Sequence, residues 1–371
     1  MSGFRCGFLA EKARVPPVSA RLSDIADQAG VSEATVSRVL NDRPGVAAAT
    51  RAAVLAALDV LGYERPLKLR RRSAGLVGLI TPELDNPIFP AFAQTISDGL
   101  TQQGWTPVLA TQTPGGATED ELTELLVERG VAGMVFVSGL HADSTASKER
   151  YERLRTRGIP FVMINGYTPE VNAAFVSADD REAVRLAVSH LVDLGHRRIG
   201  LAVGQRRYVP VQRKIDGFLD ACRELLGQDR DAAAELVEDS LYTLEGGRAA
   251  ALVLLDRGCT AVVCASDLMA LGAIRAARER GLAVPRDFSV VGYDDSPLIA
   301  FTDPPLTTLR QPVRAMGQAA VRALLEEMDG VARRDGEFVF HPELVVRGSS
   351  SSVPGEAGNP APRGRTGHPR I

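Results

Sequence analysis

The run of residues 21–41, RLSDIADQAGVSEATVSRVLN, constrains the chain more than any other segment. Ser23 and Ser32 stand where N-cap residues are expected, each just before a helical pattern. Gly30 lies between the two patterns and supplies the sharp turn that joins two short helices. The segment therefore predicts a helix-turn-helix.

The second of these helices, over residues 33–40, has two unlike faces. Its apolar residues fall at positions i, i+3 and i+4 and predict one buried stripe, which holds Val36, Val39 and Leu40. Small, polar and cationic groups share the opposite face: Glu33, Ala34, Ser37 and Arg38. That face suits the major groove of DNA, although an ordinary pair of amphipathic helices would show the same periodicity.

The charge distribution favours the DNA interpretation. The whole chain has a net charge of −3, but residues 1–72 carry 12 Lys and Arg against 7 Asp and Glu, a net +5. The remainder therefore carries −8. A basic head on an acidic body is expected when only the head meets phosphates.

The head is expected to span residues 21–63, after a flexible extension over residues 1–20. A third helix is predicted from Ala48 to Leu61, with Val54, Leu58 and Leu61 on its buried face. Residues 64–75 then predict a basic linker, because Pro66 blocks helix continuation and a cluster of Lys and Arg follows it.

The pattern changes at Leu76, where short apolar runs begin to alternate with helical stretches. Most of the helical stretches end at a glycine suited to the C′ position: Gly104, Gly130, Gly158, Gly195, Gly258 and Gly281. The alternation predicts doubly wound parallel sheets with right-handed crossovers. Residues 76–347 are long for one sheet, so we expect two α/β subdomains with a cleft between them. The Ser-, Gly- and Pro-rich tail, residues 348–371, is expected to be disordered.

Several classes of protein are disfavoured. No stretch is long and apolar enough to span a bilayer, and Arg5 and Glu11 break the short apolar part of the N-terminus, so a cytoplasmic protein is expected. The four cysteines show no metal-site spacing, and Cys259 and Cys264 are expected in the core. An enzyme is not expected, nor a cofactor, since neither GxGxxG after the first strand nor GxSxG is present.

Head, linker and body together resemble the LacI/GalR family of bacterial transcription repressors. The matching segments include DIADQAGVSEATVSRVLN, PELDNPIF, HLVDLGHRRIGL, FSVVGYDDS and PPLTTLRQP, in the family's order over about residues 21–347. The resemblance implies a helix-turn-helix head hinged to a body shaped like a type I periplasmic sugar-binding protein. It also implies homodimers that bind palindromic operator DNA and respond to a small molecule, often a sugar, in the cleft. A free sugar-transport protein would share the body but would lack the head.

The chain departs from the family pattern in three places. Val46 is followed by three alanines, where the third helix usually has a Ser or Thr cap. The linker is about three residues shorter than that of the lactose repressor and more basic. The tail lacks the heptads of a tetramerising helix, so dimers are expected.

The resemblance assigns DNA contacts within the head and linker. Glu33 and Ala34 follow the helix-opening Ser32 and would choose bases, although Glu33 equally suits a helix-dipole role. Arg38 would read a guanine, and phosphates would be held by Thr35, Ser37 and Asn41. Leu69 would wedge into the minor groove, with Leu67 as the alternative, beside Arg70 and Arg71.

The resemblance also assigns effector contacts in the body, mostly after predicted strands. These residues are Asp85, Asn86, Phe89, Asn165, Asp179, Arg213, Lys214, Ser266, Asp294 and Gln311. Asp294 is the favoured one, because a carboxylate binds pairs of sugar hydroxyls well. Phe89 and Tyr208 are candidates for stacking on a sugar ring, with core packing as the alternative for Phe89. Asp267 is instead expected to cap a helix or turn.

Overall fold

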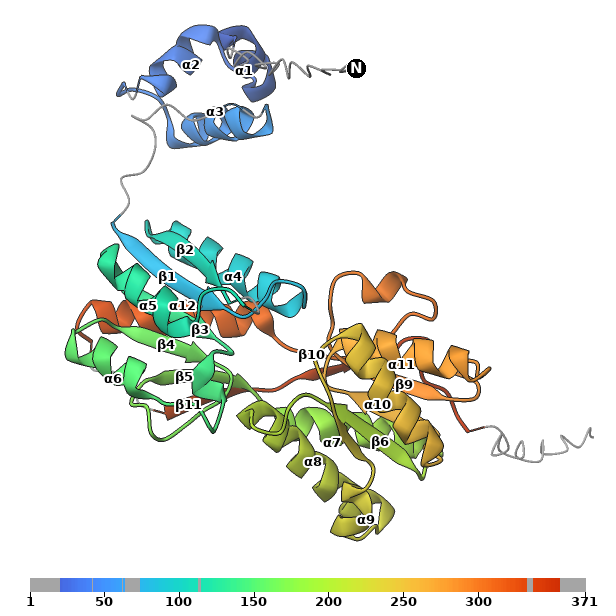
Figure 1. Ribbon diagram of the computed structural model, residues 1–371. Helices are drawn as coiled ribbons and strands as arrows, with labels where there is room; N and C mark the ends of the chain where they lie inside the picture. Colours follow the sequence, from blue (N-terminus) through green and yellow to red (C-terminus); the bar gives the residue numbers. More distant parts are fainter. Residues whose placement is uncertain are drawn as a thin grey trace, which may run out of the picture. The chain divides into compact units, whose positions relative to one another are not determined.

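The computed structural model of the protein describes residues 21–41, 43–61, 63, 74–112, 115–331 and 336–353. The chain forms two compact units, one ending at Ser73 and the other beginning at Ala74 (Figure 1). The first is the head and the second is the body. No helix among the described residues combines the length and the apolar character needed to cross a membrane.

The head contains the three predicted helices, α1 (Leu22–Ala29), α2 (Glu33–Leu40) and α3 (Ala48–Val60). Gly30 turns the chain after α1 with φ 65°, a left-handed conformation that glycine adopts without steric cost. Ser32 caps α2, because its side chain accepts a hydrogen bond from the Thr35 N–H at 3.2 Å. The prediction that Ser23 caps the first helix is wrong: α1 begins two residues earlier than this cap implies, and Arg21 occupies the N-cap position without a side-chain bond.

A small apolar core holds the three helices together. Its fully buried members come from all three: Ile25, Val36, Val39 and Val54. Leu40 and Leu61, also predicted to face inward, are half-buried and pack against this core. Helix α3 begins at Ala48, and its N-cap residue Ala47 provides no side-chain cap, as the alanine run predicts.

The body contains two six-stranded sheets, which confirms the predicted pair of α/β subdomains. The first sheet has the order β11-β5-β4-β3-β1-β2 and is parallel throughout. Its strands are β1 (Leu76–Thr81), β2 (Thr106–Thr111), β3 (Val131–Val137), β4 (Phe161–Ile164), β5 (Ala174–Ala178) and β11 (Gly336–Phe340). Its helices are α4 (Ile88–Gln102), α5 (Glu119–Glu128), α6 (Glu149–Thr156) and α12 (Val313–Met328).

The second sheet has the order β12-β10-β9-β8-β6-β7 and is parallel except at β12. Its strands are β6 (Ile199–Val203), β7 (Val237–Asp239), β8 (Ala261–Cys264), β9 (Ser289–Asp294), β10 (Thr307–Arg310) and β12 (Glu343–Val345). Its helices are α7 (Asp180–Asp193), α8 (Val209–Leu226), α9 (Arg230–Ala234), α10 (Leu244–Asp256) and α11 (Asp267–Glu279). Two short 3-10 helices lie at Leu140–Ala142 and Ile299–Phe301.

Within the described residues the chain passes between the two sheets three times. It leaves the first sheet after β5 to enter α7, returns from β10 into α12, and leaves again from β11 into β12. Figure 1 shows these passages side by side at the junction of the subdomains. Each subdomain is therefore built from separate stretches of sequence.

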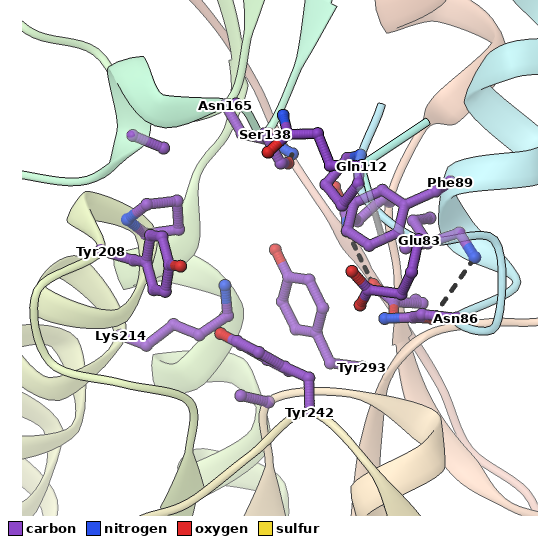
Figure 2. Close-up of a pocket in the computed structure, with 18 of the residues that line it drawn as sticks. Glu83, Asn86, Phe89, Gln112, Ser138, Asn165, Tyr208, Lys214, Tyr242 and Tyr293 are labelled. Atoms are coloured by element: carbon purple, nitrogen blue, oxygen red, sulfur yellow. Dashed lines mark hydrogen bonds between the residues drawn. The ribbon is translucent and has the colours of Figure 1, made fainter. Parts of the chain in front are cut away.

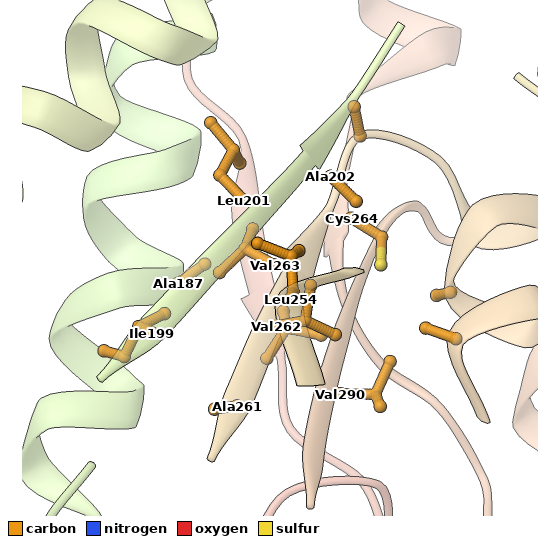
Figure 3. Packing of buried hydrophobic residues seen from close by; sticks show 14 of the residues in the cluster. Ala187, Ile199, Leu201, Ala202, Leu254, Ala261, Val262, Val263, Cys264 and Val290 are labelled. Carbon is orange, nitrogen blue, oxygen red and sulfur yellow. The ribbon is translucent and has the colours of Figure 1, made fainter. Parts of the chain in front are cut away.

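The strands of the second sheet lie in a continuous apolar core (Figure 3). Every residue of β6 and β8 is buried, as expected for parallel strands covered on both faces. Cys259 and Cys264 lie in this core, as predicted, and burial raises the pKa of both thiols. Strand β2 differs, because it lies at an edge of the first sheet and remains partly exposed.

The helix ends follow the glycine pattern. All six glycines predicted at C′ positions have φ between 68° and 90°. Each therefore ends its helix with a left-handed residue.

The body continues beyond its predicted end at residue 347. Ser349 is fully buried, and its hydroxyl donates to the Val290 carbonyl at 2.6 Å and accepts from the Thr307 N–H at 2.8 Å. The Ser351 N–H donates to the Ser289 hydroxyl at 3.1 Å. The prediction of disorder is therefore wrong for residues 348–353, and residues 354–371 lie outside the described part of the chain.

Candidate functional site

The outward face of α2 carries the side chains that the sequence placed there. Glu33, Ala34 and Arg38 are exposed, and Ser37 is half-buried. This face is unlike the buried stripe of the same helix and is open to a partner.

Hydrogen bonds fix both ends of that face. The Ser32 and Thr35 hydroxyls are 2.9 Å apart at the start of α2. At its end, the Asn41 side-chain amide donates to the Ser37 carbonyl at 2.9 Å. The three predicted linker contacts, Leu69, Arg70 and Arg71, lie outside the described residues.

The body contains a cavity of about 250 Å³ between its two subdomains (Figure 2). Its lining follows the carboxyl ends of strands in both sheets: Glu83 comes after β1, Gln112 after β2, Asn165 after β4 and Asp294 ends β9. Ligands of open α/β sheets bind at this edge. The cavity is therefore the expected place for an effector.

Six of the ten predicted effector residues line this cavity. They are Asn86, Phe89, Asn165, Lys214, Asp294 and Gln311. Tyr208, predicted as a stacking residue, lines it as well.

The other four predicted residues have different places, because the structure does not put them among the residues that line the cavity. Asp179 caps α7 by accepting from the Glu182 N–H at 3.0 Å, and the fully buried Ser266 caps α11. Arg213 forms a bidentate pair with Glu337 on β11, at 2.6 and 2.9 Å, which ties α8 to the other subdomain. Asp85 is exposed in the loop after β1.

Asp267 has the structural role that the sequence favoured. Its carboxylate accepts hydrogen bonds from the Ser296 N–H and hydroxyl at 2.7 and 2.8 Å, and from the Thr308 hydroxyl at 2.6 Å. Burial raises its pKa to about 6, against the effect of these hydrogen bonds. Asp267 thus fixes the loop that follows Asp294.

A buried carboxylate organises the first-subdomain wall of the cavity. Glu119 is fully buried and accepts hydrogen bonds from the Tyr151 hydroxyl at 2.5 Å, the Leu140 N–H at 2.7 Å and the Gln112 amide at 2.9 Å. Leu140 and Gln112 both line the cavity. A side chain at Gly139 would come within 2.4 Å of Glu119, so the backbone must approach closely there.

The loop after β3 is fixed from a second side. The Lys148 ammonium donates to three carbonyls of this loop, those of Leu140, His141 and Asp143, at 2.9, 3.2 and 2.5 Å. His141 donates from Nε2 to the Asn165 carbonyl at 2.5 Å. Burial lowers the pKa of His141 to about 4, so its imidazole is neutral near pH 7.

The second-subdomain wall carries the one cationic side chain among the described lining residues. Lys214 is buried and paired with Asp180. Its ammonium also lies 4.2 Å from the centre of the Tyr293 ring, and the Tyr293 hydroxyl donates to Asp180 at 3.0 Å. Protein groups therefore already compensate the positive charge of Lys214.

Asp294 ends β9 inside the cavity. The Gln311 amide donates to its Oδ1 at 2.7 Å. Burial, and next the negative charge of Asp267, raise the pKa of Asp294 well above its usual value. The neutral form is therefore favoured until a ligand supplies hydrogen bonds to the carboxylate.

Backbone strain is concentrated at this cavity. Three lining residues other than glycine have positive φ: Ser138 at 47°, Asn165 at 64° and Asp294 at 114°. Such conformations persist only where the surroundings enforce them, and they are common at ligand sites.

Contacts across the cleft join the subdomains beside the cavity. Asp143 forms a β-bridge with Tyr208, and its carboxylate is 3.0 Å from the Arg207 guanidinium. The Ser144 hydroxyl donates to the Arg207 carbonyl at 2.7 Å. The cavity is thus bounded by segments through which the two subdomains contact each other.

Sequence reasoning missed several lining residues. Among them are Glu83, Gln112, Ser138, Tyr242 and Tyr293. Gln112 and Ser138 directly follow β2 and β3, so the rule that ligands bind at strand ends could have found them. No group of three or more His, Cys, Asp or Glu side chains within the described ranges is arranged to hold a metal ion.

Two family models match the chain. Residues 21–65 match bacterial regulatory proteins of the lacI family, and residues 188–350 match a periplasmic binding protein-like domain. The HTH-type transcriptional regulator reg1 of Streptomyces lividans is 70% identical over 92% of this chain and 100% of its own length. MalR of Streptomyces coelicolor is also 70% identical with the same coverage. The repressor CytR of Escherichia coli is 32% identical over 92% of this chain and 100% of its own.

Solved structures agree with this assignment. The transcriptional regulator CelR in complex with cellobiose has a TM-score of 0.66 and 32% identity, covering 90% of this chain and 100% of that one. The Lac repressor dimer bound to operator and the anti-inducer ONPF has a TM-score of 0.63 and 27% identity, covering 90% and 99%. The chain therefore belongs to the LacI family and is a helix-turn-helix transcriptional regulator, not an enzyme.

Proposed function

We propose that this regulator is a cytoplasmic repressor that binds a palindromic operator as a homodimer and responds to a sugar in the cavity of its body. The observation that carries the proposal is the cavity itself, which combines amides, carboxyl groups and aromatic rings from both subdomains. The complex of CelR with cellobiose supports a sugar, and the operator complex of the Lac repressor dimer supports the DNA and the dimer.

A ligand in this cavity would contact both subdomains at once. Asn165 belongs to the first and Lys214 to the second, while Gln311 lies on a segment that crosses between them. Such a ligand binds more tightly to one arrangement of the subdomains than to another. That difference in affinity is the requirement for coupling to DNA binding.

In the head, we assign base reading to the exposed face of α2. Arg38 would form a bidentate contact to guanine, Ala34 would touch a thymine methyl, and Glu33 would accept from cytosine. Ser32, Thr35, Ser37 and Asn41 would hold phosphates and set the register. In the linker, Leu69 would wedge into the minor groove while Arg70 and Arg71 neutralise phosphates.

The decisive experiment measures operator binding with and without sugars. Palindromes in the promoters beside the protein's own gene supply the candidate operators for a gel shift. We expect tight binding to one of them and a change in affinity when the right sugar is added. A protein that binds every DNA equally would contradict the operator assignment, and a sugar that binds without changing operator affinity would contradict the coupling.

Replacing Arg38 by alanine tests how the head reads its operator. The loss of the bidentate contact should cost about 1–3 kcal/mol and relax the preference at one base pair of each half-site. Titrations with the operator and its single-base variants measure both effects. Equal losses on all variants would instead make Arg38 a phosphate contact. Arg21→Ala, in the same head but before α1, is the control for simple loss of charge.

A further inference from the structure

The geometry points to the charge and polarity of the effector. We infer that the cavity selects an uncharged, hydroxyl-rich carbohydrate and rejects phosphorylated or carboxylated sugars, because its fixed polar groups are mainly hydrogen-bond acceptors. This inference rests on the proposed function and narrows the class of sugar that the site takes.

Gln112 shows how an acceptor is fixed. Its Nε2 donates to the Glu119 carboxylate at 2.9 Å. Because a carboxylate accepts hydrogen bonds, the amide nitrogen must face Glu119, and Oε1 is left for a ligand. Glu119 itself is held by the Tyr151 hydroxyl and the Leu140 N–H, so the amide cannot turn without breaking a buried network.

Two further amides also donate from their nitrogen to a protein oxygen. Gln311 donates from Nε2 to Asp294 at 2.7 Å, and its buried Oε1 has no hydrogen-bond partner in the described structure. Asn165 donates from Nδ2 to the Ser138 hydroxyl at 3.1 Å. All three amides line the cavity with one N–H of each nitrogen engaged by protein, while no protein donor in the described structure bonds to their oxygen atoms. Their oxygens need donors, and the hydroxyls of a sugar supply them.

Asn86 is the exception and supplies a matched donor. Its Oδ1 accepts from the Ile88 N–H at 3.4 Å, which leaves Nδ2 for a ligand oxygen. Figure 2 shows Asn86 and Glu83 together on one side of the cavity. One amide donor suits a hydroxyl or ring oxygen but is too little for a phosphate.

The charges exclude an anion more strongly. The carboxyl group of Glu83 lines the cavity, the buried Asp294 favours its neutral form, and the one cation among the described lining residues, Lys214, is paired with Asp180. A phosphate or carboxylate would therefore enter among acceptors without a free positive charge. The rings of Phe89, Tyr208 and Tyr242 offer apolar surfaces for the C–H faces of a neutral sugar (Figure 2).

Calorimetry on the full-length protein tests the inference with matched sugars. The panel contains glucose, maltose and cellobiose, each beside a phosphorylated and a uronic acid derivative. We expect a neutral sugar to bind and its anionic derivatives to bind at least about tenfold more weakly. An anionic derivative that binds as tightly as its parent would overturn the inference but leave the proposed function standing. If no sugar of either kind binds or alters operator affinity, the proposed sugar response itself fails.

Gln112→Glu tests the amide orientation without any ligand. It places a second carboxyl group beside Glu119, so the melting temperature should fall at pH 8 and recover at lower pH as the pair takes up a proton. Gln318→Glu, at an exposed position on α12, is the matched control and should show neither change. A Gln112→Glu protein that melts like this control at pH 8 would show that Nε2 does not face Glu119, and would overturn the inference.

Discussion

The two walls of the cavity are built in different ways. The first-subdomain wall consists of polar groups on loops after strands, and a second layer of buried charged or polar residues holds them: Glu119, Lys148 and His141. The second-subdomain wall consists of tyrosines and the Lys214–Asp180 pair on α8, α7 and β9. That wall stands directly on the large apolar core of Figure 3.

Because of this difference, we expect substitutions at the two walls to affect different properties, fold stability for the first wall and ligand affinity for the second. Groups behind the first wall fix the loops through hydrogen bonds that exist only in the folded protein, so their loss should mainly cost stability. The tyrosine rings of the second wall are held mainly by packing against the apolar core. Their replacement should mainly cost ligand affinity.

The largest effect is expected for Glu119→Ala. It leaves the Tyr151 hydroxyl, the Leu140 N–H and the Gln112 amide without their buried acceptor, which should lower the free energy of unfolding by about 3–5 kcal/mol. Urea unfolding of the full chain measures the change. Glu128→Ala, at an exposed position of the same helix, should change it by less than about 0.5 kcal/mol. If Glu119→Ala and Glu128→Ala were equally stable, the residues behind the first wall would not be needed for stability, and the proposed difference between the walls would be wrong.

The second-largest effect is a dependence of fold stability on pH, caused by His141. Its pKa is lowered to about 4 in the folded protein from 6.5, so the unfolded chain binds a proton first as the pH falls. The contribution of neutral His141 to the free energy of unfolding should therefore be fully present above about pH 6.5. It should decrease by about 3 kcal/mol as the pH falls toward 4. His141→Gln should flatten this decline, whereas the exposed His341→Gln should not.

His190 and His196 leave a residual slope in the His141→Gln protein, because burial lowers their pKa values too. The comparison to make is therefore between the two variants across the same pH series. If the free energy of unfolding varied with pH identically in His141→Gln and His341→Gln, His141 would not be buried as a neutral imidazole.

On the second wall, Asp294→Asn should weaken effector binding by about 1–3 kcal/mol through the loss of hydrogen bonds to a charged group. Asparagine keeps the side-chain shape and tolerates positive φ, so operator affinity should stay nearly unchanged. Ligand hydroxyls favour the ionised form of Asp294, whose pKa is raised, so parent affinity should increase with pH and variant affinity should not. Calorimetry with the effector at two pH values measures this, and equal affinities of parent and variant would remove Asp294 from the site.

The smallest effect is expected for Tyr208→Ala. Loss of a stacking ring should cost about 0.5–1.5 kcal/mol of effector affinity, with little change in unfolding. Leu241→Ala removes an exposed apolar side chain outside the cavity and serves as the control. If Tyr208→Ala lowers the free energy of unfolding by more than it lowers the effector affinity, the second wall contributes to stability as the first wall does.

Local signals were enough to predict the head and the order of elements in the body. The Ser32 cap, the Gly30 turn and the buried spacing of Val36 and Val39 all depend on neighbours within one or two helical turns. Ser23 failed because both it and Arg21 precede the same apolar pattern, and the difference of two residues is below the resolution of that pattern.

The candidate site was harder to predict because strand ends serve two purposes. Asp294 and Asn165 follow strands and line the cavity, whereas Asp179 and Ser266 follow strands and cap the next helix. A Ser or Asp at that position is suited to both roles, so the sequence alone does not separate them. Tyr242 reaches the cavity from a loop whose position depends on the whole subdomain, and no local pattern marks it.

The three passages of the chain between the sheets also determine the order in which the body can be completed during synthesis. Helix α12 supplies Met316, Ala320 and Leu324 to the core of the first subdomain, and β11 closes its sheet beside β5. Both are made after nearly all of the second subdomain, which runs without interruption from Asp180 to Arg310. The half of the body that is translated first therefore remains incomplete longest, with β3, β4 and β5 uncovered on the side where α12 later packs. A nascent chain stopped at residue 310 would present that face to chaperones.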